Sequence, residues 1–406
     1  MRQKLIKRTL LGLCLFHIFI NGLAICVPVI VLFWQAHGLT LTQITILQGF
    51  FAALMVVFEI PSGYFADMWG RKRAIVISSI VFTGGAALLC FSITFLQFMI
   101  AEICFAVALS LLSGADAALM YDTLKLGKRS DEYEKIWGRL MSISLTASAL
   151  LTSMAGFLYQ IHMRLPFILG TVSIALSLVG ALMLTEPPRQ RIKAKGIYFT
   201  GLWQAVKPYV RENRAYRELI LWFAIVFSLV QSGLWYYQPY FVVCEIPVIW
   251  FGFLFMAFNL TAAAASRFSG HLSRWTQRFP VGAFPLMLVM ASYLIMGHWA
   301  KPGAVGTILL QQMVRGWFSI AISARLNRLV DSANRATLLS FCTMAGRLVY
   351  SGFVPLSGWM VDRFTLLSAL KYMGIAATIM FIIRILVPRQ DELVSVRKAK
   401  YSRPSI

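Results

Sequence analysis

Long apolar runs separated by short polar segments make up most of the chain. Each run is about 20 residues long, which is the length that an α-helix needs to cross the hydrocarbon core of a bilayer. Lipid cannot satisfy backbone hydrogen bonds, and runs this continuous differ from the alternating pattern of barrel strands, so helices are expected. Twelve spans are predicted, near residues 10–33, 43–65, 74–93, 96–124, 136–160, 164–184, 218–243, 249–269, 281–298, 302–324, 336–361 and 366–387. The pattern therefore predicts an all-α, polytopic membrane protein.

Composition and charge agree with this pattern. Of the 406 residues, 59% are hydrophobic and 13% are charged, whereas about a quarter of the residues of a soluble protein are charged. The formal net charge of +22 comes mainly from bases in the loops of one membrane face. By the positive-inside rule we expect both termini to be cytoplasmic, in a bacterial inner membrane. Bases spread along a membrane face do not form a nucleic-acid-binding module, so no nucleic-acid partner is expected.

The chain divides near its middle, at its longest polar interval. Six predicted spans stand on either side, and Leu202, Val206 and Tyr209 recur within the interval at helical spacing. Such spacing is typical of a short amphipathic helix on a membrane surface. We predict an N-terminal six-helix bundle over 1–187, a cytoplasmic linker with this helix over 188–217, a C-terminal bundle over 218–388, and a basic tail over 389–406.

The two halves also resemble each other in sequence. A shift of 202 residues places Gly114 on Gly316 and Gly156 on Gly358. Internal duplication with a binding site between the repeats is the usual architecture of secondary transporters. Two pseudo-symmetric bundles are therefore predicted.

The turn between the second and third spans concentrates charge and glycine in the stretch GYFADMWGRKRA. Gly70 permits a tight reversal. Asp67 can accept hydrogen bonds from a helix N-terminus, and Arg71 can donate two hydrogen bonds to a carboxylate. The spacing Gly63-x-x-x-Asp67-x-x-Gly70-Arg71-Lys72 resembles the signature loop of the major facilitator superfamily.

This resemblance implies the twelve-helix fold of that family and a conformational latch. In the family, the acid of the loop caps the start of the eleventh helix. The arginine reaches an acid at the inner end of the fourth helix, which here is Asp122, with Arg139 nearby. Such a latch holds the outward-open state, whereas a loop that only anchors topology is the alternative. FEIPSGYFADMWGRK, NRATLLSF, Gln238-Pro239 and PLSGWMVDR also resemble recurrent segments of one bacterial branch.

Two positions depart from the family pattern. In the second half, SGHLSRW has Arg274 where an acid is expected, which implies a weaker latch there. The fifth span has Gly156 in LTSMAGFLYQ but lacks the Gly-Pro pair of the drug:proton antiporter branch.

Polar and ionisable residues within the spans are candidate functional residues, because charge inside a bilayer is costly unless it is paired or wetted. The family resemblance implies that spans one, four, seven and ten line a central cavity. The candidate substrate and proton residues of these spans are His17, Asn21, Glu102, Asp116, Gln231, Trp235, Gln238, Gln311 and Arg315.

Asp116 and Arg315 lie at comparable depth on the fourth and tenth spans. We predict that they face each other across the cavity. Asp116 would carry a proton, released or held according to whether Arg315 is near or is engaged by an anionic or polar substrate group. A permanent structural ion pair, or an arginine that snorkels within the second half, would explain the same residues.

Glu59 in span two and Arg347 in span eleven raise a similar question. These spans pack together between the halves in the family, so we predict a gating ion pair, with Glu59 as an alternative proton site. His17 alone is more typical of a packed polar residue than of a proton carrier. Trp235 and the two tyrosines after it are candidates to stack on an aromatic or cationic substrate, although such residues more often face lipid or the core.

Motifs of enzymes are absent from the sequence. The chain has no phosphate-binding Gly-x-x-x-x-Gly-Lys loop, no His-Glu metal spacing and no serine-nucleophile elbow. Its six cysteines fall within predicted spans or, for Cys244, one residue beyond one, without the spacing of metal ligands. Neither a catalytic residue, a metal nor a cofactor is predicted.

These features predict a proton-coupled secondary transporter that moves a small organic molecule by alternating access, as a monomer in the bilayer. Export is slightly favoured, on the aromatic seventh span and the antiporter-like signature loop. Import of a nutrient, siderophore or metabolite is the alternative within transport. A receptor or scaffold that derives from a transporter and moves nothing is the alternative from another class. The residues do not indicate which molecule is carried.

Overall fold

The computed structural model describes residues 2–187, 198–276, 278–330 and 335–386, and it contains no strand in these ranges. The first half contains α1 (Arg2–Phe19), η1 (Ile20–Ile25), η2 (Val27–Val29), α2 (Ile30–Ala36), α3 (Leu41–Trp69), α4 (Arg71–Phe91), α5 (Phe95–Leu112), α6 (Ala115–Leu126), η3 (Ser130–Glu132), α7 (Tyr133–Ile161) and α8 (Leu165–Met183). After α9 (Tyr198–Glu212), the second half contains α10 (Arg214–Val243), η4 (Val248–Trp250), α11 (Phe251–Arg267), α12 (Ser269–Thr276), α13 (Ala283–His298), η5 (Pro302–Thr307), α14 (Ile308–Leu329), α15 (Arg335–Arg363) and α16 (Leu366–Leu386).

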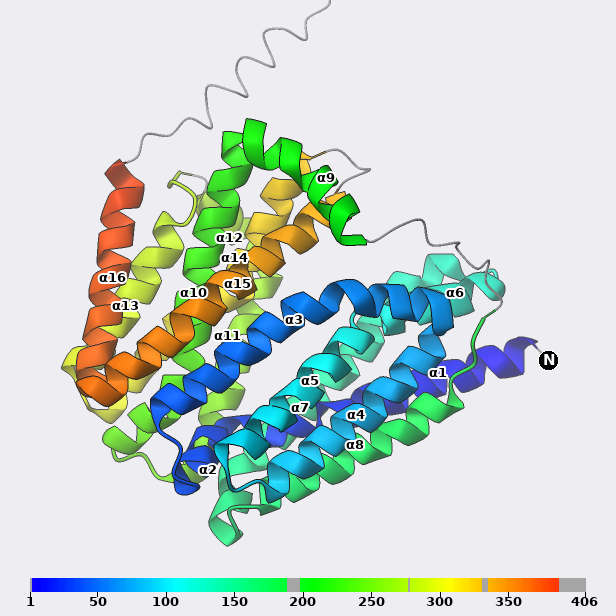
Figure 1. The fold of residues 1–406 in the computed structure, drawn as a ribbon, viewed down its shortest axis with the longest axis horizontal. Helices are drawn as coiled ribbons and strands as arrows, with labels where there is room; N and C mark the ends of the chain where they lie inside the picture. The colour runs from blue at the N-terminus through cyan, green and yellow to red at the C-terminus, as the bar shows by residue number, and fades with distance from the viewer. Residues whose placement is uncertain (1, 188–197, 277, 331–334, 387–406) are drawn as a thin grey trace, which may run out of the picture.

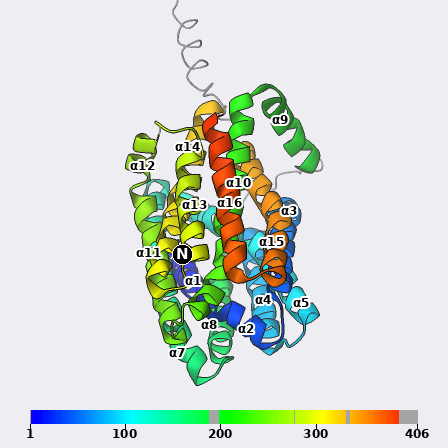
Figure 2. The same cartoon turned by 90° about the vertical axis from the view of Figure 1, so that its left-hand side faces the viewer.

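The helices form two bundles that diverge from a shared end (Figure 1). Helices α1–α8 pack against one another in the first bundle, and α10–α16 pack in the second. Helix α9 lies across the end of the second bundle and contacts α10 and α15 (Figures 1 and 2). Within both bundles, apolar and aromatic side chains form the buried core.

Ten helical segments of the described residues are long and apolar enough to cross a membrane. Helix α13 is shorter, and α14 is a continuous helix whose apolar sequence contains Arg315, Arg325 and Arg328. Both pack inside the second bundle beside α10. The predicted all-α fold, with twelve spans in two six-helix bundles, is confirmed.

The first span is not one continuous α-helix. After α1 ends at Phe19, the backbone forms the 3-10 turns η1 and η2 before α2 begins at Ile30. Pro28 lies in η2 and has no N–H to donate to the carbonyl of Ala24, four residues earlier. Thr152 of α7 donates to that carbonyl instead, over 3.2 Å. Non-helical backbone at membrane depth is tolerated because neighbouring groups satisfy it in this way.

The fourth span is interrupted as well. Helix α5 ends at Leu112, Gly114 has a φ of +76°, and α6 begins at Ala115. Left-handed backbone ends an α-helix, and glycine adopts it without a steric penalty. Ser113 and Gly114 are exposed, and a Cβ added at Gly114 would meet nothing within 4 Å. Asp116 therefore lies in the first turn of a new helix, beside open space.

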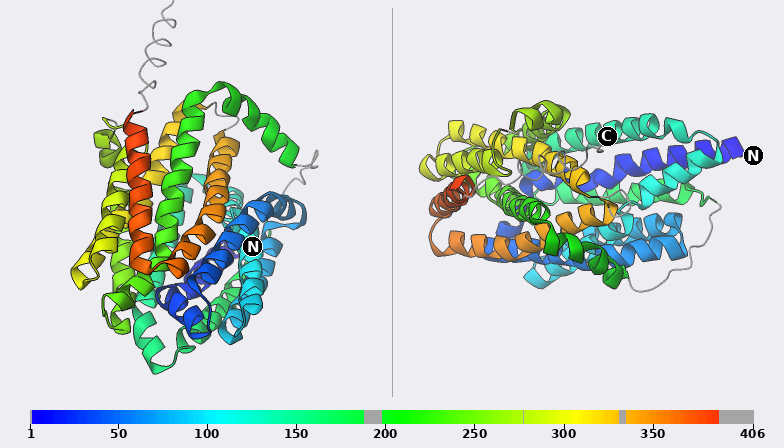
Figure 3. Two further views of the ribbon diagram at one scale, coloured as in Figure 1. Left: turned by 60° about the vertical axis from the view of Figure 1, so that its left-hand side comes forward. Right: turned by 90° about the horizontal axis from the view of Figure 1, so that it is seen from above.

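The bundles contact each other at the end away from Arg2 of α1 and Leu386 of α16, which we call the closed end. Gly156 of α7 packs against Val248 and Ile249 at the start of α11, and Gly358 of α15 packs against Thr45 of α3. A Cβ at either glycine would overlap these neighbours, so the close approach requires glycine. Seen from above, α3 (blue) and α15 (orange) lie along the same side of the molecule, and they contact each other (Figure 3). The two glycines that the shift of 202 residues relates thus make equivalent contacts between the halves.

Candidate functional site

The two interrupted spans bring a histidine and an aspartate together. His17 is in the last turn of α1, and its Nε2 lies 3.2 Å from Oδ2 of Asp116 in the first turn of α6. Their side chains are 9% and 14% exposed. A carboxylate is favoured at a helix N-terminus, and an imidazole is the side chain that most readily gains a proton near neutral pH. Two ionisable side chains, one from the first span and one from the fourth, therefore meet where the two spans are interrupted.

Asn21 supports this pair from the first turn of η1. Its Nδ2 donates to the carbonyl of His17 over 2.6 Å and to Oγ of Ser144 over 2.7 Å. Ser144 belongs to α7 and itself donates to the carbonyl of His17 over 3.1 Å. The backbone at the end of α1 is therefore fixed to the fifth span, which holds His17 in place.

A row of aromatic rings leads from His17 to an open cavity. His17 lies edge-on to Trp137 at 5.6 Å between ring centroids, and Trp137 stacks on Tyr133 at 6.1 Å. Tyr133 in turn meets Tyr121 edge-on at 5.5 Å. Both tyrosines line a cavity of 310 Å³, together with Arg71, Gly114, Ala117, Ala118 and Asp122.

The signature loop is anchored on α6, next to this cavity. Arg71 donates through Nη1 to the carboxylate of Asp122 and, over 2.7 Å, to the carbonyl of Ala118. Glu186 accepts from the backbone N–H groups of Arg71 at 3.0 Å and Lys72 at 2.7 Å, and so caps α4. Gly70, which precedes the cap, has a φ of +117°. The structure therefore brings Arg71 to the acid that the family resemblance implied.

Other parts of the expected latch are less complete. Helix α3 runs through Gly63 and Asp67, but the contacts of both residues lie outside what the structure describes, as do residues 331–334 before α15. The cap of the eleventh helix by Asp67 stays a prediction. Arg139 is exposed on α7 and forms no ion pair within the described part of the chain.

The predicted pairing of Asp116 with Arg315 is not present in this structure. Arg315 is exposed on α14 and donates through Nη2 to Oδ1 of Asn259 on α11, over 2.7 Å. Asp116 lies against His17 instead. The two bundles diverge at this depth, so each charged group finds its partner within its own half.

Gln238 of span seven lies at the closed end, where it joins the two halves. Its side chain is 1% exposed. Its Oε1 accepts from the backbone N–H of Val31 over 2.8 Å, and its Nε2 donates to the carbonyl of Val27 over 2.8 Å. Val31 is in the first turn of α2, where backbone N–H groups lack partners within the helix. In this structure Gln238 caps a helix of the other half, and its place in an open cavity stays a prediction.

Trp235 is buried at the same boundary. Its Nε1 donates to the hydroxyl of Tyr350 over 2.7 Å, and its ring packs against Trp34 of α2 at 5.9 Å. The two tyrosines that follow it are also buried, Tyr236 against Ser357 and Tyr237 against Gln311. Contact of these aromatic residues with substrate in an open cavity is therefore not observed, because the stripe faces the closed end and the interior of the second bundle.

Asp362 makes a second cap across the boundary. It is in the last turn of α15, and its two carboxylate oxygens accept from the backbone N–H groups of Leu41 at 3.2 Å and Thr42 at 2.7 Å. These two residues begin α3. The closed end is thus held by side chains of the second half that cap two helix N-termini of the first half.

Glu102 is buried close to the closed end. It is 5% exposed, and Oε1 accepts from Nε2 of Gln48 on α3 over 3.0 Å. No cation lies within ion-pair distance of Glu102 among the described residues. The carboxyl group of Glu102 therefore joins the fourth span to the second by a buried hydrogen bond.

The remaining candidates of spans seven and ten lie inside the second bundle. Gln311 is fully buried, accepts from the hydroxyl of Tyr237 over 2.8 Å and donates to Ser292 over 2.9 Å. It therefore belongs to a structural hydrogen-bond network instead of the expected cavity wall. Gln231 is half-buried on α10.

Glu59 and Arg347 form the ion pair that was expected between spans two and eleven. Nη1 of Arg347 donates to Oε2 of Glu59 over 2.9 Å, and the side chains are 33% and 23% exposed. Its role as a gate stays a prediction.

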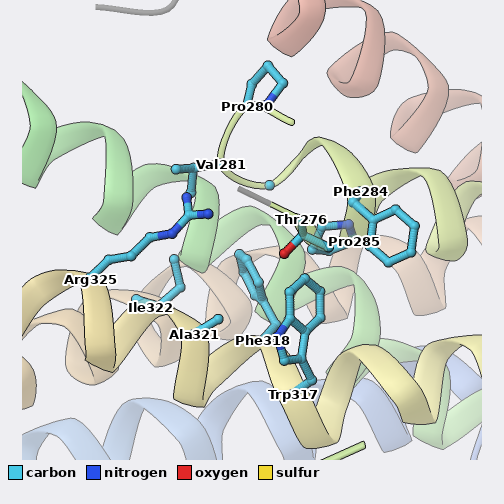
Figure 4. A pocket seen from close by; sticks show the side chains of 11 residues that line it. Thr276, Pro280, Val281, Phe284, Pro285, Trp317, Phe318, Ala321, Ile322 and Arg325 are labelled. Atoms are coloured by element: carbon cyan, nitrogen blue, oxygen red, sulfur yellow. The ribbon is translucent and has the colours of Figure 1, made fainter. Parts of the chain in front are cut away.

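A second pocket lies in the other half but is too small to hold an organic substrate. Trp317, Phe318 and Phe284 crowd it (Figure 4). Its volume is 10 Å³, which is about the room that one water needs. Among the described residues, no three His, Cys, Asp or Glu side chains gather as a metal site requires.

Several of these residues were not predicted as functional residues from the sequence. Tyr133 and Trp137 lie one turn apart at the start of span five, and Asp362 is an acid at the end of a span; both are signals visible in the sequence. Ser113-Gly114 inside an apolar run, and Pro28 in the first span, are signals of helix interruption. The pairing of Arg315 with Asn259 has no comparable signal.

Comparison with known proteins decides the family. The model of the major facilitator superfamily matches residues 10–348. The chain belongs to this superfamily. No curated protein matches the sequence.

Solved structures of the same fold are transporters. A mutant of the nucleoside transporter NupG is 12% identical with a TM-score of 0.72, over 95% of this chain and 98% of that one. A bacterial homolog of the human lysosomal transporter Spinster, in an inward-facing and unoccupied conformation, is 16% identical with a TM-score of 0.71, over 95% of both chains. A POT family transporter in complex with a thioalcohol-conjugated peptide is 11% identical with a TM-score of 0.67, over 98% and 96%. At these identities the likeness shows the fold alone, whereas the family match supports a secondary transporter.

Proposed function

We propose that this superfamily transporter is proton-coupled and moves a small organic molecule across a bacterial inner membrane by alternating access. The observation that carries the proposal is the contact of His17 with Asp116 between two interrupted spans. Ionisable residues within transmembrane segments are typical of proton pathways, and interrupted helices are typical of the coupling sites of secondary transporters.

Protonation of Asp116 changes two interactions at once. A neutral carboxyl group loses its attraction to a protonated His17, and it loses the favourable interaction with the N-terminus of α6. Helix α6 is 12 residues long, and Asp122 near its other end binds Arg71 of the signature loop. A shift of this short helix therefore links the proton site to the latch.

The same proposal assigns the structure to the inward-open state. The closed end carries the caps made by Gln238 and Asp362, whereas the start of α1 and the end of α16 lie at the opposite end. The excess of bases on the terminal face supports a cytoplasmic position for that end. Rocking the halves to the outward-open state requires that both caps break.

The direction of transport receives less support than the coupling. The aromatic residues of span seven, which favoured export from the sequence, are buried in this structure. The signature loop remains in favour of export, whereas a pair such as His17 and Asp116 serves an importer equally well.

The test begins with melting temperatures of the purified protein against a panel of metabolites and drugs at pH 6 and pH 8. A ligand that binds the folded state raises stability by about 2.7 kcal/mol at a hundredfold excess over its Kd. Each ligand found is then used in proteoliposomes, with and without a pH gradient. Asp116→Asn should bind and exchange this ligand but fail to accumulate it, and its binding should lose the pH dependence.

The matched control is Asp131→Asn, at an exposed acid in the turn between α6 and α7. It should behave as the wild type does. Gradient-driven accumulation by Asp116→Asn with an unchanged pH profile would overturn the proposal. A protein whose hits bind without any transport, in either direction, would favour the receptor or scaffold alternative.

A further inference from the structure

The cavity between α6 and the start of α7 is a wide-open hollow with a volume that a small ligand requires. Its volume of 310 Å³ is at the lower end of the range of small-molecule sites, about 300–1,000 Å³. Gly114, Ala117 and Ala118 line it from α6, and such small side chains leave room for a flat group. Tyr121 and Tyr133 form two walls whose ring planes meet at 77°.

The two tyrosine rings are available to a ligand and are held in place. Tyr121 is 43% exposed. Tyr133 is half-buried, because Trp137 stacks on it at an interplanar angle of 11°. The face of an aromatic ring is electrostatically negative and attracts cations. A rigid corner of two such rings therefore favours a ligand that is both flat and positively charged.

The charged side chains of the cavity agree with this preference. Arg71 and Asp122 compensate each other, and the described contacts of Asp122 use Oδ2. Oδ1 of Asp122 has no hydrogen-bond partner among the described residues, and its side chain is 30% exposed. The cavity thus offers a free carboxylate oxygen and two ring faces, with its one arginine already neutralised.

We propose that this cavity binds a small aromatic cation, stacked on Tyr121 or Tyr133 with its charge toward Asp122, as the part of the substrate site that the first half contributes. The inference rests on the proposed transport function, since it names the substrate class of that transporter. A cation beside Asp122 weakens the attraction between Asp122 and Arg71, so substrate binding loosens the signature loop.

The test is equilibrium binding to the purified, full-length protein in lipid nanodiscs, without any pH gradient. The probe is N-methylquinolinium, a flat cation with two fused rings. Quinoline at pH 8 has the same rings without the charge, and 2-naphthoate has similar rings with a negative charge. The cation should bind saturably, and the other two should bind at least several-fold more weakly.

Three variants locate the site. Tyr121→Leu and Tyr133→Leu should each weaken binding of N-methylquinolinium by about 2- to 30-fold, the range expected for a cation over an aromatic face. Tyr133→Phe keeps the ring and should lose less binding than Tyr133→Leu. Tyr372→Leu is the matched control, because Tyr372 is 42% exposed on α16, outside the cavity.

The outcomes of these binding measurements test the cation site independently of proton coupling. Absence of saturable binding at millimolar probe overturns it, and so does equal binding of quinoline or 2-naphthoate. Equal losses in Tyr121→Leu and Tyr372→Leu would assign the binding to general partition into the protein surface, which also overturns it. In each of these cases, an Asp116-dependent pH gradient effect would leave the proposed function standing. Binding with the expected variant pattern, but without Asp116-dependent coupling, would support the cation site alone.

Discussion

Gly114 and Gly316 occupy equivalent positions in the two halves, yet the structure uses them in opposite ways. Gly114 has left-handed backbone, interrupts the fourth span and faces open space. Gly316 lies inside the continuous helix α14, where a Cβ would overlap the backbone of Ala262 on α11. One glycine provides a break, and the other provides close packing. Duplicated sequence therefore does not imply duplicated function.

The same contrast extends through both bundles. In the first half, the interrupted spans one and four carry His17 and Asp116. In the second half, the corresponding helices α10 and α14 are continuous. Tyr237 of α10 donates a buried hydrogen bond to Gln311 of α14. We interpret the first half as the part that responds to protons and substrate, and the second half as a more rigid body whose side chains cap it at the closed end.

The largest expected effect distinguishes the two glycines by stability. Gly316→Leu forces α14 away from α11 and should cost about 3 kcal/mol or more, since overpacking typically costs about 1–3 kcal/mol even for smaller insertions. Gly114→Leu meets open space and should cost about 1–2 kcal/mol, for its left-handed backbone alone. Melting temperatures of the two variants measure the difference. A greater loss for Gly114→Leu would contradict the assignment of packing to one glycine and a break to the other.

The next largest effect concerns the glutamine that joins the halves. Gln238→Leu leaves the N–H of Val31 and the carbonyl of Val27 without their partner, at about 1–3 kcal/mol for each buried group. The closed end should therefore open more often. A Thr45→Cys reporter, in a protein whose native cysteines have been replaced, should then be labelled faster by a thiol reagent. Thr45 is fully buried against Gly358 in this structure.

Gln311→Leu is the matched control, because Gln311 is equally buried but bonds within the second half. It should lower the melting temperature without faster labelling of the reporter. Faster labelling in both variants would show that general loosening, rather than the cap, exposes position 45.

A moderate effect is expected from the two carboxylates that cap helices. Asp362→Asn removes the charge that caps α3 across the halves, at about 0.5–2 kcal/mol for a helix cap, and the same reporter should label about 2- to 30-fold faster. Glu186→Gln weakens a cap within the first half and should leave the labelling rate unchanged. Equal rates in the two variants would remove Asp362 from the closed-end contacts.

The smallest effect is expected at the ion pair of Glu59 with Arg347. Both side chains are partly exposed, and such pairs contribute about 0–1 kcal/mol. Glu59→Gln should change reporter labelling by at most a few-fold. Loss of gradient-driven accumulation in this variant, with Asp116→Asn unaffected, would instead make Glu59 the proton site.

Much of the fold and part of the site could be predicted from residues alone. The apolar runs located the spans, and the signature loop pointed to Arg71 with Asp122, which the structure brings together. The partners of Asp116, Arg315 and Gln238 could not be predicted in this way. Helical spacing shows which residues share a face, but it leaves open the rotation of each helix in the bundle and the neighbour that this face meets.

The sequence by itself determined the membrane class, the number of spans and the pseudo-symmetry, because apolar length and backbone hydrogen bonding in lipid leave few other solutions. Only the tertiary structure decided that His17 is the neighbour of Asp116 and that Gln238 and Asp362 hold the closed end. The reason is physical: these contacts join residues about 100 to 320 positions apart, and they exist in a state where the halves meet at one end and diverge at the other. Local sequence signals do not specify such a state.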